Sequence, residues 1–198
     1  IHFHSTPFLD RSSQEKAKSL VENLTRYQYN SRLYLVPFGE IQRQVTLCAP
    51  SPLRVVLYRR LMVRIAEVIG QQNQAQALVT GESLAQVASQ TLTNIGVIQE
   101  AANLPILRPL IGMDKNEISA KAEQIGTYAI SIQPDQDCCS LFVPKHPSTH
   151  SKLEEIKAVE EKLHVNTLVA HGVEGATVEE FHFPEAIHPS QIKEPVSS

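Results

Sequence analysis

The most constraining stretch of the sequence is an apolar run that ends in Thr80-Gly81 and continues directly into a helical pattern. Residues 77–80 read Ala-Leu-Val-Thr, and apolar residues recur at helical spacing from Ser83 to about Ala101. This order predicts a buried strand, a tight turn and a helix N-terminus. Small molecules bind beyond the carboxyl ends of parallel strands, where a glycine lets backbone approach a ligand. The stretch therefore predicts a ligand site, and the helix N-terminus would favour an anion such as phosphate.

Similar patterns alternate along the rest of the chain. Helices are expected over about 14–27, 53–69, 114–126 and 151–163, and further strands over 32–37 and 105–110. Repeated alternation of strand and helix predicts an α/β fold with a doubly wound parallel sheet flanked by helices. Asp114 and Glu117 match a capping box, and Gly126 matches the residue that follows a helix.

The two ends of the sequence suggest the domain organisation. Residues 1–5, Ile-His-Phe-His-Ser, look like the end of a strand, so we expect the domain to be truncated at its N-terminus. The apolar periodicity fades after Leu163. We therefore expect one domain over residues 1–163 and a partly irregular C-terminal extension over residues 164–198.

Composition narrows the classes of function. The formal net charge is −3, so any binding of nucleic acid would depend on local basic residues. The three cysteines are too few and too irregularly spaced for a secreted disulfide framework, which favours the reducing cytoplasm. No apolar run has transmembrane length and no signal-peptide pattern is visible, so no membrane partner is expected.

Two adjacent cysteines, Cys138 and Cys139, lie in a polar stretch that also contains Asp135 and Asp137. Their spacing suits neither a disulfide between them nor a zinc knuckle. One interpretation is a nucleophilic or sulfur-carrying thiol, which would need a cation from elsewhere in the fold to offset the aspartates. The alternative is a pair of inert loop cysteines.

Other polar residues leave similar alternatives. The expected helix at 53–69 carries four arginines, which form either a solvated basic face or a phosphate site: Arg54, Arg59, Arg60 and Arg64. Arg60 and Arg64 share a face, whereas Arg59 points elsewhere. His2 and His4 would share one face of a strand, but no third ligand at a fixed spacing supports a metal site. Glu82 could cap a helix or point to solvent.

Residues 81–92, Gly-Glu-Ser-Leu-Ala-Gln-Val-Ala-Ser-Gln-Thr-Leu, resemble the signature of the tRNA 4-thiouridine synthetases, also called tRNA sulfurtransferases or the ThiI family. The resemblance covers about residues 1–163. Neighbouring motifs occur in the same order as in the family: His2-Phe3-His4-Ser5, Leu35-Val36-Pro37-Phe38, Arg59-Arg60-Leu61-Met62, Arg108-Pro109-Leu110, Ile125-Gly126-Thr127-Tyr128 and Asp137-Cys138-Cys139.

This resemblance implies a PP-loop ATP pyrophosphatase domain of the adenine-nucleotide alpha-hydrolase type. Such enzymes use ATP, which Mg²⁺ is expected to accompany, to adenylate uridine 8 of tRNA. A persulfide sulfur then displaces AMP and leaves 4-thiouridine. The same sulfur relay serves thiazole synthesis for thiamine.

The resemblance also implies site residues and partners. Nucleotide contacts would fall on His2, Phe3, Arg59, Gly81 and Gln90, and Cys139 would handle sulfur. The expected partners are tRNA, a cysteine desulfurase as sulfur donor and the sulfur-carrier protein of thiazole synthesis, with a homodimer as a candidate assembly. Lys145, Lys152 and the arginine-rich helix could contact tRNA phosphates.

The sequence departs from the family pattern in one important respect. The phosphate-gripping Ser-Gly-Gly-x-Asp-Ser motif does not occur in these 198 residues, and neither do the N-terminal regions that bring tRNA to the enzyme. Two other interpretations therefore stay open. The chain could be a non-catalytic nucleotide-fold remnant that acts in dimerisation or tRNA docking, or a sulfur-relay protein that does not use ATP.

Overall fold

The structure is a computed structural model, and it describes residues 1–135, 142 and 144–183. One sheet contains β1 (His2–His4), β2 (Asn30–Pro37) and β5 (Thr177–His182), in the order β1-β2-β5. Strand β1 runs parallel to β2, with Phe3 opposite Val36, and β5 runs antiparallel to β2. A second, parallel sheet pairs β3 (Leu78–Val79) with β4 (Ile106–Leu107).

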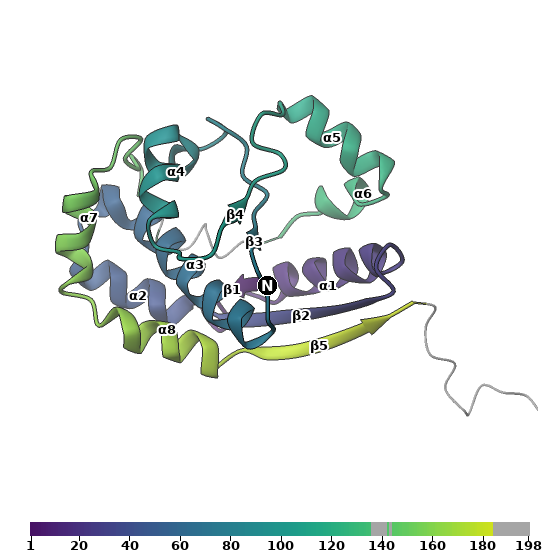
Figure 1. Cartoon of the computed structure of the whole chain (residues 1–198), viewed down its shortest axis with the longest axis horizontal. Coiled ribbons are helices and arrows are strands. Elements are labelled where there is room, and N and C mark those ends of the chain that lie inside the picture. The colour runs from purple at the N-terminus through teal and green to yellow at the C-terminus, as the bar shows by residue number, and fades with distance from the viewer. Residues whose placement is uncertain (136–141, 143, 184–198) are drawn as a thin grey trace, which may run out of the picture.

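Helices cover both faces of the central strand β2 (Figure 1). Consecutive side chains of a strand point to opposite faces, and both Leu35 and Val36 are buried. Helix α1 (Ser12–Thr25) packs on the sheet, and Val36 belongs to a core cluster centred on α3 (Arg54–Gln72). The expected α/β fold with parallel strands between helices is confirmed.

Helix α3 is the centre of the core. Its apolar residues Leu57, Leu61, Ile65 and Ile69 recur at helical spacing and are all buried. The other helices are α2 (Gly39–Cys48), η1 (Ser51–Leu53), η2 (Ala88–Gln90), α4 (Leu92–Gln99), α5 (Lys115–Gln124), α6 (Tyr128–Ser131), α7 (Leu153–Glu160) and α8 (Val165–Glu174). Helices α4 and α8 pack against α3, which therefore joins the two sheets into one body.

The helix expected from Ser83 to about Ala101 is wrong in its first half. Residues 84–85 form a turn and residues 86–87 a bend, and α4 begins only at Leu92. Ala85 has a φ of +62°, which a helix cannot accommodate, and the side chain of Thr91 caps α4 instead by accepting a hydrogen bond from the Asn94 N–H. No helix N-terminus therefore lies at the Thr80-Gly81 turn.

Residues 164–183, the described part of the segment after Leu163, are more regular than their periodicity indicated. They form α8 and then β5, which runs antiparallel to β2. Strand β5 lies at the edge of its sheet and is largely exposed, so its sequence carries little apolar alternation. The capping box of Asp114 and Glu117 and the C-terminal position of Gly126, with φ of +74°, are confirmed.

Candidate functional site

A cavity of about 670 Å³ lies between the two sheets. Its walls include Phe3 of β1, Tyr34 of β2 and residues 78–82 at and beyond β3, and α3 contributes Arg59 and Met62. Strand β1 pairs only with β2, and β3 only with β4, among the described strands. The cavity is therefore bordered by two strands whose second edge is unpaired, and the carboxyl end of β3 opens into it.

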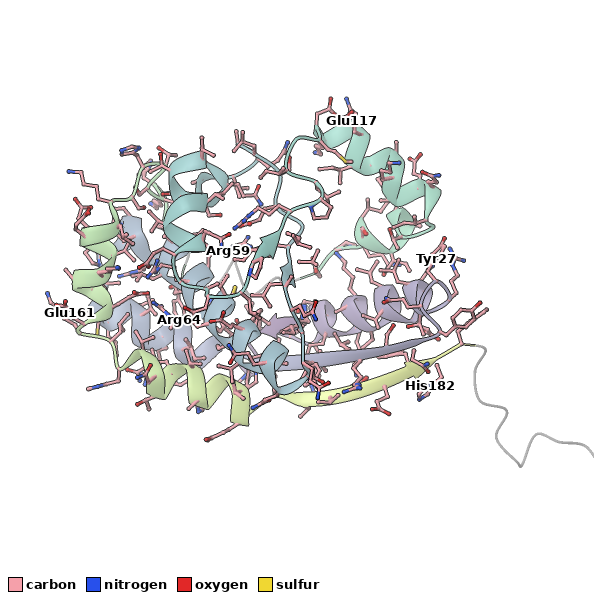
Figure 2. The ribbon with its side chains drawn as sticks, in the orientation of Figure 1. Tyr27, Arg59, Arg64, Glu117, Glu161 and His182 are labelled. Atoms are coloured by element: carbon pink, nitrogen blue, oxygen red, sulfur yellow. The ribbon has the colours of Figure 1, made fainter. Side chains whose placement is uncertain are left out.

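Two arginines line this cavity, Arg32 and Arg59, and Arg32 is already bound by Asn73 and Glu180. Arg59 lies in the N-terminal half of α3 and is partly buried (Figure 2). Within the described residues, its side chain makes no hydrogen bond or ion pair. An arginine fork presents several donors that match phosphate oxygens. Arg59 is thus available to bind an anionic ligand.

Gly81 lies in the turn that follows β3, on the wall of the same cavity. A Cβ added to this residue would meet no atom within 4 Å, and its φ lies outside the left-handed region. Neither packing within the described chain nor backbone conformation therefore requires glycine here. Close approach of a ligand to the backbone is a physical reason for a glycine at such a position.

Glu82 resolves an alternative that the sequence left open, because it neither caps a helix nor points to solvent. Its carboxylate is buried and accepts hydrogen bonds from Thr80 Oγ1 at 3.0 Å and from Arg108 Nε at 2.7 Å. Arg108 also donates to Gln99 Oε1 at 2.8 Å. The turn is thereby fixed to β4 and α4. A negative charge next to a phosphate would be unfavourable, and the Arg108 guanidinium offsets it.

The expected nucleotide contacts are only partly brought together. Phe3, Arg59 and Gly81 line the cavity, whereas His2 and Gln90 are not among its lining residues. His2 Nε2 lies 3.4 Å from Ser13 Oγ, toward α1, because His2 and Phe3 point to opposite faces of β1. Gln90 lies in η2, and its buried amide oxygen has no hydrogen-bond partner within the described residues.

Cys138 and Cys139 lie outside the described residues, so their expected role stays a prediction. The described residues on either side contact one region of the fold. Asp135 forms an ion pair with Lys16 Nζ of α1 at 3.1 Å. The ring of Phe142 meets Phe8, just beyond β1, at 6.4 Å between centroids. A reactive thiol in this stretch would need a cation to offset the nearby aspartates, and Lys16 does this for Asp135.

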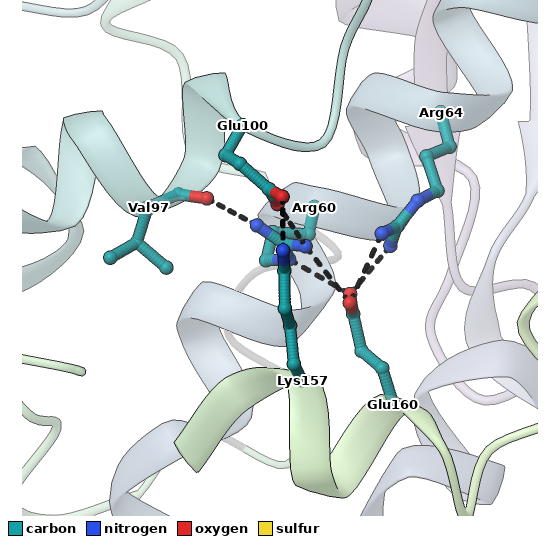
Figure 3. Close-up of polar contacts among 6 residues, drawn as sticks. All are labelled: Arg60, Arg64, Val97, Glu100, Lys157 and Glu160. Carbon is teal, nitrogen blue, oxygen red and sulfur yellow. Dashed lines mark hydrogen bonds and ion pairs between the residues drawn. The ribbon is translucent and has the colours of Figure 1, made fainter. Parts of the chain in front are cut away.

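Arg60 and Arg64 form neither a solvated face nor a phosphate site. Arg60 is completely buried, and its guanidinium donates to Glu160 at 2.8 and 2.9 Å, to Glu100 at 2.9 Å and to the Val97 carbonyl (Figure 3). Arg64 donates to the same Glu160 carboxylate at 2.5 and 3.0 Å. The network joins α3, α4 and α7. The sequence does indicate that Arg60 is buried, because it lies three residues after Leu57 and therefore on the apolar face of the helix.

The pKa of Glu160 provides a test of this network. Burial alone would raise this pKa, but hydrogen bonds and charges from Arg60 and Arg64 lower it from 4.5 to about 2. Because the folded-state pKa lies below the unfolded value, Glu160 stabilises the fold above about pH 4.5, and this contribution disappears as the pH falls toward 2. When the pH is lowered from about 5 to about 2.5, the free energy of unfolding of the unaltered chain should fall by up to about 3 kcal/mol more than that of the Glu160→Gln variant. Urea denaturation at the two pH values measures both changes. Equal losses would contradict the assignment.

Comparison with known proteins identifies the family. The family model described as thiamine biosynthesis protein (ThiI) matches residues 1–165. The chain belongs to the ThiI family. A "Probable tRNA sulfurtransferase" of Thermus thermophilus is 52% identical over 184 residues, which are 93% of this chain and 45% of that protein. One of the same name from Moorella thermoacetica is 46% identical over 178 residues, or 90% of this chain and 46% of that protein.

A solved structure shows the same fold. It is a 4-thiouridine synthetase in complex with RNA and bound ATP, and it matches this ThiI-family chain with a TM-score of 0.86 and 37% identity. The match covers 91% of this chain and 47% of the other. The chain thus spans under half the length of these relatives.

Two further properties of the described residues bear on the site. No group of three or more His, Cys, Asp or Glu side chains in the described ranges is placed to hold a metal ion. None of the helices in that part of the ThiI-family chain combines the length and apolar content needed to cross a bilayer.

Proposed function

We propose that this chain contributes the nucleotide site and the sulfur-handling cysteine of an enzyme that transfers sulfur to tRNA at the expense of ATP. The observation that carries the proposal is that Arg59, which has no partner among the described residues, and the open Gly81 turn line one cavity in a ThiI-family chain. The similarity to a 4-thiouridine synthetase with RNA and bound ATP supports ATP and tRNA as substrates.

In the proposed reaction, the uridine 8 oxygen bonds to the α-phosphorus of ATP and pyrophosphate leaves. The outer sulfur of a Cys139 persulfide then bonds to C4 of the base as the C4–O bond breaks and AMP leaves. A thiol co-reactant cleaves the remaining sulfur–sulfur bond and frees 4-thiouridine. Within the chain, Arg59 and the backbone at Gly81 bind and orient phosphate, with Mg²⁺ accompanying the nucleotide. His2, Phe3 and Gln90 are proposed as further nucleotide contacts.

The lining of the cavity supports a second element of the proposal. Part of its lining is apolar and includes Met62, Ala66 and Leu78, and these residues suit contact with the side chains of a further β-strand. The edges of β1 and β3 that pair with no other described strand offer backbone partners for such a strand. We therefore assign residues 1–163 to a PP-loop domain whose first strand and phosphate loop come from outside these residues, with 164–198 as its C-terminal extension.

Sulfur supply completes the proposal. A cysteine desulfurase would load the Cys139 persulfide, and the same persulfide would serve the sulfur-carrier protein of thiazole synthesis. The ThiI family model supports the link to thiamine. Transfer of labelled sulfur from a desulfurase to the chain, followed by passage to either acceptor, tests this branch.

Arg59→Ala tests the nucleotide site. In the complete protein that contains this chain, we expect ATP affinity in calorimetry to fall about 10- to 100-fold, because a charge-assisted hydrogen bond to phosphate is lost. The matched control is Arg43→Ala, which removes an arginine that pairs with Glu40 on α2, away from the cavity. An unaltered affinity for Arg59→Ala would remove this residue from the site. No ATP binding by the unaltered complete protein would favour a non-catalytic remnant.

Gly81→Ala separates ligand approach from folding. Because an added Cβ meets no atom of the described chain, the free energy of unfolding should change by less than about 1 kcal/mol. The affinity for ATP should nevertheless fall about 10-fold or more, since the Cβ occupies space that the ligand needs. Gly112→Ala is the control, because a Cβ there also meets open space. A loss of stability without a loss of affinity would contradict this role.

A further inference from the structure

The direction of the Arg59 side chain depends on how α3 is rotated about its axis. Successive residues of an α-helix point about 100° apart, so the setting of Arg60 fixes that of Arg59. Arg60 reaches Glu160 of α7 and both Glu100 and the Val97 carbonyl at α4 (Figure 3). Arg59, one position earlier, faces the cavity instead.

We propose that Arg60 is a positioning residue, which holds Arg59 toward the cavity by locking the rotation of α3 against α4 and α7. The proposal rests on the proposed function, in which Arg59 contacts ATP. Within the described residues, no side chain or backbone group binds the Arg59 guanidinium, so its direction is set by the helix that carries it.

The chemistry of Arg60 suits this role better than a role in stability alone. A buried ion pair often adds little to stability compared with apolar residues of similar volume. An apolar side chain, however, tolerates small rotations of its helix, whereas the planar guanidinium fork is held by directional hydrogen bonds from three sides. Met62 and Val63 of α3 also line the cavity, so a rotation of the helix would displace its floor as well.

A double-mutant cycle in the complete protein tests this inference with ATP as the probe. Arg60→Lys retains the charge but removes the fork, and it should weaken ATP binding about 5- to 20-fold. In an Arg59→Ala background the same change should weaken binding less than about 2-fold, because the residue through which Arg60 acts is absent. Melting temperatures identify folded variants.

Glu100→Gln is a second variant in case Arg60→Lys does not fold. Its side chain is 37% exposed, so its loss perturbs the core less, and its effect on ATP affinity should also depend on Arg59. Glu155→Gln is the control, because this exposed carboxylate of α7 pairs with Lys152 and contacts none of the residues of the Arg60 network.

The outcomes separate the inference from the proposed function. If Arg59→Ala weakens ATP binding while Arg60→Lys and Glu100→Gln leave it unchanged, or weaken it equally in both backgrounds, the positioning role is overturned and the nucleotide site stands. If Arg59→Ala itself leaves ATP affinity unchanged, both the contact at Arg59 and the role of Arg60 are overturned.

Discussion

Replacing Glu160 with alanine is expected to lower the free energy of unfolding by about 3 to 5 kcal/mol, because it leaves a buried guanidinium without its main partner. Arg60 has no exposed surface, and Glu160 accepts two of its hydrogen bonds. Glu100 is on the rim of the network and partly exposed, so it cannot replace the lost carboxylate. Urea denaturation followed by circular dichroism at neutral pH measures the change.

Glu161 offers a matched control for this experiment. It is the next residue in the sequence and is exposed, and Figure 2 shows it at the end of α7. Glu161→Ala removes the same chemical group and should change the stability by less than about 0.5 kcal/mol. Similar losses for the two variants would mean that the network of Arg60 does not contribute through its buried charge.

Replacing Cys139 with serine is expected to reduce 4-thiouridine formation about 1000-fold or more in the complete protein, because a hydroxyl cannot carry a persulfide. Affinity for ATP should stay within about 2-fold of the unaltered protein, since the proposed nucleotide site is built from other residues. Quantifying 4-thiouridine in digested tRNA, together with calorimetry, measures both effects.

Two other cysteines serve as controls. Cys48→Ser alters an exposed free cysteine at the end of α2 and should retain full activity. Cys138→Ser tests the adjacent residue, and the prediction assigns the larger loss to Cys139. Full activity of Cys139→Ser would remove this residue from the mechanism, and inactivity of Cys138→Ser alone would move the persulfide by one position.

The elements that the sequence predicted best have strong apolar periodicity. Helix α3 was expected over 53–69 and spans Arg54–Gln72, because its buried residues leave little ambiguity in the pattern. The segment from Ser83 was misassigned for the opposite reason. Its spacing is compatible with a helix, but the positive φ of Ala85 and the hydrogen bond from Ser83 Oγ to the Met113 carbonyl favour a turn instead. The spacing of apolar residues within a segment carries no information about a contact with a residue 30 positions away.

The same limit applies to the candidate site. The strand-end glycine and the separate direction of Arg59 follow from local sequence, and both residues lie on one cavity. The burial of Arg60 depends on a carboxylate that is 100 positions away in the sequence. The pairing of Glu82 with Arg108 likewise bridges β3 and β4. Charged residues alone do not indicate which partner they will meet, so their roles emerge only once the fold is known.

Within the part of the chain that the structure describes, β1 and β3 each have an edge without a neighbouring strand, and this has a consequence for behaviour in solution. Exposed strand edges are templates for pairing with another chain, and no charged side chain lies within β3. Preparations of the isolated chain should therefore self-associate through these edges, to an extent that rises with protein concentration. A strand supplied within the same molecule would compete at a fixed local concentration, so the complete protein should resist such aggregation even in concentrated samples.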